Sequence, residues 1–167
     1  MEGPLDHEAL RKSLSLIVDR HESLRTRFQE IDGVATQVVY PSVHLDMPLT
    51  ELPSTELEQA ARAILLEEAR APFDASTGPL LRLRLLRFGA RSHVLLAVFA
   101  HVITDAWSVF NFLSELIRAY DAFSSNRAPD LEELPVQYGD YAAWQRRHIA
   151  GAVLARRLGY WRERLSG

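Results

Sequence analysis

Residues 81–108 read LRLRLLRFGARSHVLLAVFAHVITDAWS, and the expected fold is built outward from this stretch. Leucines alternate with arginines over residues 81–87, which predicts a half-buried strand. Gly89-Ala90-Arg91 is typical of a turn. The run at 94–99 is apolar at every position, so we expect a central strand covered on both faces. The stretch therefore predicts two adjacent strands, the second of which ends at His101.

The residues before this stretch predict a helix and then a hairpin. Residues 6–20 carry apolar side chains at helical spacing behind Asp6, a candidate N-cap. Two β-prone runs follow at 24–31 and 34–40. They are separated by Asp32-Gly33, the strongest short hairpin signal that a sequence offers.

A polar, proline-containing loop is expected over residues 41–53. Thr55 and Glu58 then form a candidate capping box for a second helix that ends near Arg70.

Three further helical segments are expected after the strands, at 108–123, around 138–145 and in a short region that ends near 165. The order of elements favours an α+β fold, in which helices pack on a mixed, largely antiparallel sheet.

Composition narrows the class of protein. The 167 residues contain 19 Lys and Arg against 22 Asp and Glu, for a net charge of −3, and no cysteine. This excludes disulfides and thiolate chemistry, and it argues against nucleic acid as a partner, since that requires a concentrated basic field. No apolar run is long enough to span a bilayer. We therefore expect a cytoplasmic protein with no membrane partner.

His101 and Asp105 are the candidate functional pair, four residues apart in the loop that follows the buried strand. Such loops commonly present catalytic groups. A single histidine at a strand end is also often a structural residue, and an H-x-x-x-D pattern alone is weak. No third ligand has convincing spacing, so we expect no metal site.

Three motifs in the same order give the pair a family context. Residues 100–108, AHVITDAWS, resemble the H-H-x-x-x-D-G core motif of condensation domains of nonribosomal peptide synthetases. Residues 20–28, RHESLRTRF, resemble the family motif R-H-E-x-L-R-T-x-F, and residues 138–145, YGDYAAWQ, resemble Y-x-D-Y-A-x-W-Q. The closing Tyr160-Trp161 is also similar to the family.

The resemblance implies one lobe of a chloramphenicol acetyltransferase-like fold. Condensation domains pair two similar lobes around a tunnel that holds the active site. Residues 1–167 resemble a trimmed N-terminal lobe, in which residues 1–6 match the end of the family's first strand. The opening S-x-x-Q-x-R-L-W motif and the C-terminal lobe lie outside this sequence.

By the same resemblance, the domain joins a carrier-bound donor acyl or peptidyl thioester to the amino group of a carrier-bound aminoacyl thioester. The expected partners are peptidyl or acyl carrier proteins, the C-terminal lobe and neighbouring synthetase domains. No cofactor is bound covalently, since the substrates arrive on phosphopantetheine arms of the carriers. His101 aligns with the catalytic second histidine, and we expect it mainly to position the attacking amine.

Asp105 and Arg25 are expected to support the site structurally as an ion pair, because a buried carboxylate requires a partner and arginine offers a bidentate one. The alternative for Asp105 is a solvent-facing helix N-cap. Trp107 is interpreted as a core anchor. Two residues depart from the family pattern: Ala100 replaces the first histidine, and Ala106 replaces the glycine. If position 106 needs a positive φ, alanine costs about 1 kcal/mol there.

The other aromatic and basic residues have plainer interpretations. Tyr138, Tyr141 and Trp144 are expected to pack in the interior. The arginines of residues 82–87 are expected to form a solvated strand face, with docking of an acidic carrier protein as the alternative.

Three functions remain open from the sequence. The first is an amide-forming condensation domain, active only with its second lobe. The second is a catalytically degenerate half-domain that docks a carrier protein or another synthetase domain. The third is a related acyltransferase that uses soluble CoA thioesters. A lobe that lacks its partner should expose an apolar face around His101 and should self-associate.

Overall fold

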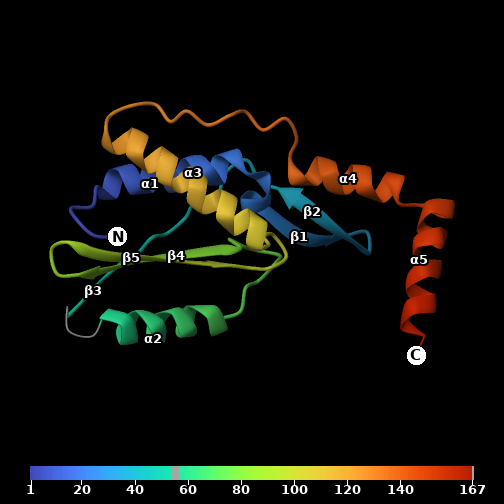
Figure 1. Ribbon diagram of the computed structural model, residues 1–167, viewed down its shortest axis with the longest axis horizontal. Coiled ribbons are helices and arrows are strands. Elements are labelled where there is room, and N and C mark those ends of the chain that lie inside the picture. The colour runs from blue at the N-terminus through green and yellow to red at the C-terminus, as the bar shows by residue number, and fades with distance from the viewer. Residues whose placement is uncertain (54–56, 167) are drawn as a thin grey trace. The chain divides into compact units, whose positions relative to one another are not determined.

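The structure is a computed structural model that describes residues 1–53 and 57–166. The chain divides into two compact units, residues 1–133 and residues 134–167. The first unit contains a three-stranded sheet with helices on both faces, and the second consists of two helices (Figure 1).

The elements follow one another in an order close to the one expected from the sequence. They are α1 (His7–Arg20), the short 3₁₀ helix η1 (Glu22–Arg25), β1 (Thr26–Ile31), β2 (Val34–Val39), β3 (Leu49–Leu52), α2 (Leu57–Arg70), β4 (Leu81–Phe88), β5 (Ser92–Phe99), α3 (Ala106–Ser124), α4 (Tyr138–His148) and α5 (Gly151–Leu165). The α+β class and the mixed sheet are confirmed. The candidate capping residue Thr55 lies outside the described residues.

Strand β4 is central in the sheet, and β5 is not. The strand order is β3-β4-β5, with β3 parallel and β5 antiparallel to β4. The sequence interpretation reversed the roles of β4 and β5, because an uninterrupted apolar run was taken to mark the central strand. β4 tolerates its arginines because they contact a helix and not water. Glu2 and Ser92 form an isolated antiparallel bridge at the start of β5.

Strand β3 falls in the segment that the sequence analysis expected to be a loop. Residues 49–52 pair with residues 85–88, and the Leu85 amide donates to the Pro48 carbonyl at 3.0 Å. Upstream of β3, Val43, Leu45 and Met47 pack against the core at alternate positions. That short alternation was the only local signal, and the prolines around it obscured it.

The main core lies between the sheet and the helices α1 and α3, which cover one face of the sheet (Figure 1). It contains the inward-facing leucines of β4 together with Leu14 and Ile17 of α1 and Phe112 and Leu116 of α3. Asp6 caps α1 as predicted, because its side chain accepts from the Ala9 amide at 2.9 Å.

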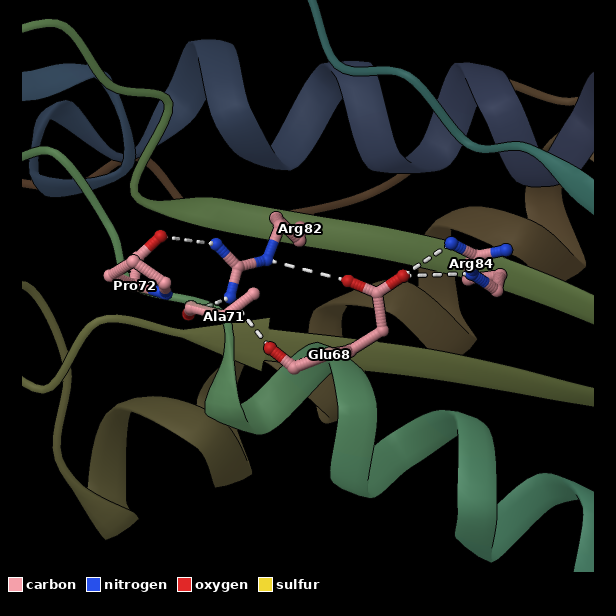
Figure 2. A network of polar contacts seen from close by, with 5 residues as sticks. All are labelled: Glu68, Ala71, Pro72, Arg82 and Arg84. Carbon is pink, nitrogen blue, oxygen red and sulfur yellow. Dashed lines mark hydrogen bonds and ion pairs between the residues drawn. The ribbon is translucent and has the colours of Figure 1, made fainter.

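Helix α2 covers the opposite face of the sheet through a second, smaller cluster and a polar network (Figures 1 and 2). The Arg82 guanidinium donates to the carbonyls of Glu68, Ala71 and Pro72 at 2.6–3.1 Å, and it lies 3.8 Å from the centroid of the Phe73 ring. The Glu68 carboxylate accepts from Arg84 at 2.5 and 2.8 Å. Arg82 therefore closes the C-terminal end of α2, whose last carbonyls have no partner within the helix.

The expectation of a solvated arginine face on β4 is therefore wrong. Arg82 and Arg84 are bound to α2, and Arg87 forms an ion pair with Glu51 of β3. Since these arginines have carboxylate partners, the alternative of carrier docking on this stripe loses its support.

The hairpin β1–β2 forms as predicted and is a separate two-stranded sheet. Asp32 and Gly33 have φ of 52° and 75°, as a two-residue turn between twisted strands requires.

The second unit does not bury the aromatic residues that were expected to pack. Tyr138, Tyr141 and Trp144 are all exposed on α4. They contact one another along the helix instead, and the Trp144 ring stacks on the His148 ring with centroids 4.9 Å apart. In the part of the chain that the structure describes, no helix has the length and apolar character needed to cross a bilayer.

Candidate active site

His101 lies at the tip of a short turn that is fixed on both sides. Before it, the Ala100 amide donates to the Leu80 carbonyl at 2.9 Å. After it, the Ile103 amide donates to the Ala100 carbonyl at 3.1 Å, and the Ile103 side chain is buried in the core. The His101 side chain is exposed, and it makes no hydrogen bond within residues 1–53 and 57–166. The chain therefore presents this imidazole on a rigid support.

Asp105 is the N-cap of α3 and is exposed. Its Oδ1 accepts from the Ser108 amide at 2.8 Å and from the Ser108 hydroxyl at 2.6 Å. The Ser108 hydroxyl, followed by the Ser108 amide, holds the pKa of the Asp105 carboxyl below its ordinary value of 3.8. The cap fixes the direction in which α3 leaves the turn that carries His101.

The predicted ion pair between Asp105 and Arg25 does not form. Arg25 instead donates to the carbonyls of Val18 at 3.1 Å and Asp19 at 3.0 Å, at the end of α1, and also to the carbonyl of Tyr40. The physical reason is local on both sides. The carboxylate satisfies an amide at the start of one helix, and the guanidinium satisfies carbonyls at the end of another. Arg25 thus holds α1 against the hairpin and does not touch the His101 turn.

The sequence analysis did not identify Glu115, the residue that ties the R-H-E segment to the site helix. Glu115 of α3 accepts from Arg20 Nε at 3.3 Å and interacts with His21 Nε2 at 2.7 Å. These three side chains are mostly buried. A signal was present, because Glu115 shares the helical face of Phe112 and Leu116, where a carboxylate needs a partner.

An exposed apolar surface adjoins the His101 turn in the sequence. Val102 in the turn is exposed, and so are four side chains of α3: Trp107, Phe110, Leu113 and Ile117. Trp107 is 73% exposed, so its interpretation as a core anchor is wrong. It lies one turn from Phe110, with ring centroids 6.1 Å apart. The predicted apolar face on the His101 side of the lobe is present in this structure.

The departure at Ala106 carries no backbone strain. Ala106 is the first residue of α3, and its φ lies outside the left-handed region. The expected penalty for alanine therefore does not arise. Ala100 is partly buried against the core, and its methyl group offers no hydrogen bond to the neighbouring imidazole.

Comparison with known proteins decides the family. The model of the condensation domain matches residues 1–167, the whole chain. The chain is a member of the condensation-domain family. A linear gramicidin synthase polypeptide of Brevibacillus parabrevis is 45% identical over 168 residues, which are 99% of this chain and 3% of that protein. The phosphinothricin tripeptide synthetase PhsB of Streptomyces viridochromogenes is 41% identical over 169 residues, which are 99% of this chain and 14% of that protein.

Solved structures agree with this assignment. The condensation-domain chain resembles the complex of the X-domain and OxyB from teicoplanin biosynthesis, with a TM-score of 0.86 and 30% identity, over 99% of this chain and 36% of that chain. It also resembles the SgcC5 protein of Streptomyces globisporus, with a TM-score of 0.82 and 29% identity, over 98% of this chain and 38% of that chain. The chain thus spans little more than a third of these solved structures.

Proposed function

We propose that this chain is the N-terminal lobe of a nonribosomal peptide synthetase condensation domain that forms an amide bond. In this reaction the amino group of a carrier-bound aminoacyl thioester attacks the thioester carbonyl of a carrier-bound donor. The C–N bond forms, the C–S bond breaks, and the donor's carrier leaves as a thiol. The observation that supports the proposal is the presentation of His101, exposed on a turn between Ala100 and the buried Ile103.

His101 acts in this proposal mainly by positioning the amine. An unprotonated amine needs no strong base, since about a tenth of an α-amino group is already neutral at pH 7. Alignment of two tethered substrates can contribute about 7–11 kcal/mol, whereas proton transfer contributes a factor of about 10² to 10⁴ in rate. A fixed imidazole can accept a hydrogen bond from the attacking nitrogen and stabilise the charge that develops on it.

The rigid turn suits this role because of its supports. Ile103 anchors the turn in the core, and the Asp105 cap fixes the start of α3. Neither group would touch the substrate, so both are positioning residues. The exposed side chains from Val102 to Ile117 would be covered by the C-terminal lobe, which would complete the tunnel and exclude water.

The alternative is a catalytically degenerate half-domain that docks a carrier protein or a neighbouring synthetase domain. Ala100 favours it, because the histidine that usually precedes the catalytic one is replaced by a methyl group. His101 and its supports favour the enzyme, because a purely docking surface has no need of a fixed imidazole.

The test uses the complete two-lobe protein with an acyl group on one carrier protein and an aminoacyl group on the other. Mass spectrometry of the acceptor carrier should detect the amide product within single-turnover time. Amide formation from soluble CoA donors alone would instead identify a CoA-dependent acyltransferase. Carrier binding without product from either donor would identify the docking half-domain.

A further inference from the structure

Helix α5 carries an exposed apolar stripe with coiled-coil spacing. Leu154, Leu158, Trp161 and Leu165 are separated by four, three and four residues, which are positions d, a, d and a of two heptads. All four are exposed, from 41% for Leu154 to 77% for Leu165. We name these four side chains the α5 seam.

Arginines border the α5 seam on both sides. Arg157 and Arg164 precede the two a positions and occupy the heptad position g, and Arg162 follows a d position and occupies e. Glu163 occupies f, on the side away from the seam. The seam is therefore flanked by cations alone.

The arginines of the second unit have no ion-pair partner within the described residues. Arg164 lies over the Tyr160 ring, at 5.6 Å from its centroid. By contrast, Arg82 and Arg84 of β4 share the carboxylate of Glu68. The α5 arginines thus keep their capacity for bidentate pairing with carboxylates.

The charge of the second unit is opposite to that of the rest of the chain. Residues 134–167 contain six arginines and two acidic residues, whereas residues 1–133 contain 13 basic and 20 acidic residues. The formal charges are therefore +4 and −7. A partner for the second unit must bury an apolar stripe and supply negative charge.

We propose that the α5 seam is a docking surface for an acidic amphipathic helix of a partner protein. The partner helix would present leucine-like side chains at a and d and glutamates at e and g. Its glutamates would pair with Arg157, Arg162 and Arg164 while the apolar stripes close on each other. Pairing of two α5 helices would place arginine opposite arginine, so charge disfavours self-association through this seam.

The test titrates two synthetic three-heptad peptides into the whole chain, by fluorescence anisotropy at 50 and 150 mM salt. Both carry leucine at a and d, one with glutamate at e and g and the other with lysine. We expect at least tenfold tighter binding of the glutamate peptide, weakened by added salt. The triple variant Arg157→Glu, Arg162→Glu, Arg164→Glu should reverse this preference.

A matched control separates the seam from net charge. The variant Arg146→Glu, Arg147→Glu, Arg156→Glu makes the same charge change away from the seam and should retain the preference for the glutamate peptide. Circular dichroism verifies that both variants keep their helices. A second measurement repeats the titration with the complete synthetase module, where the glutamate peptide should still bind.

Four results would overturn the proposal. They are equal affinity for the two peptides, equal loss of binding in the control variant, preferential binding to vesicles of phosphatidylglycerol and phosphatidylcholine, and absence of binding in the complete module. The last result would mean that the protein's own domains cover the seam. None of these results bears on amide formation, so this proposal and the catalytic one can fail separately.

Discussion

The two sides of α3 differ more than any other pair of neighbouring surfaces in the first unit. The inward side carries Phe112 and Leu116, which are 4% and 7% exposed, whereas Phe110 and Ile117 on the outward side are 65% and 69% exposed. Both sides are apolar. Only the inward side stabilises the fold of the chain as it stands.

The difference separates residues that build the lobe from residues that work at its surface. The inward side connects α3 to β5 through the Phe99–Phe112 ring contact, with centroids 5.1 Å apart. The outward side begins next to the turn that holds His101. An apolar surface of this kind marks an interaction site on a folded protein, which agrees with the proposal that a second lobe covers it.

The largest expected effect is a loss of stability confined to the inward side. Phe112→Ala should lower the free energy of unfolding by about 3–4 kcal/mol, because it leaves a cavity against Phe99. Phe110→Ala is the matched control on the outward side and should change it by less than about 0.5 kcal/mol. Urea denaturation followed by circular dichroism measures both. Similar losses in the two variants would remove the distinction between the sides.

A smaller effect is expected at the charged residue of the inward side. Glu115→Ala leaves Arg20 and His21 without this carboxylate in a mostly buried setting, so we expect a loss of about 1–3 kcal/mol. Asp121→Ala is the control, since its pair with Arg127 is exposed and contributes at most about 0.5 kcal/mol. Equal stabilities of the two variants would show that Glu115 is not part of the supporting structure.

The smallest effect is expected at the start of α3. Asp105→Ala removes the N-cap and should lower Tm modestly at pH 7, by less than Glu115→Ala does. The lowered pKa of Asp105 means that its contribution is present above 3.8 and is lost as pH falls through the folded-state pKa. The Tm difference between the wild type and Asp105→Ala should therefore shrink in acid. A difference that is independent of pH would contradict a role for the ionised carboxylate.

Local patterns predicted most of the elements. The helix at residues 7–20, its Asp6 cap and the Asp32-Gly33 hairpin depend on contacts only a few residues apart, so the sequence specifies them directly. The order of strands depends on pairing between distant residues. For that reason β3 was missed, and the central position of β4 was assigned to β5.

Partners of charged side chains were harder to predict than the elements that carry them. The sequence placed His101 and Asp105 in a turn between strand and helix, as the structure has them. It paired Asp105 with Arg25, although each satisfies backbone groups nearer to it. Arg82 was expected in water, and it binds the end of α2 because that helix covers a face of the sheet. Such partners depend on tertiary packing, which a pattern of residue types does not contain.

The most direct measurement is single-turnover amide formation in the complete two-lobe protein, with wild type, His101→Gln and His101→Ala compared side by side. If His101 positions the amine, the wild type forms the amide, His101→Gln retains most of its rate, and His101→Ala loses it. A loss above about a thousandfold in His101→Gln would identify His101 as the essential base. Absence of product from the wild type with any carrier-bound donor would contradict the proposed function itself.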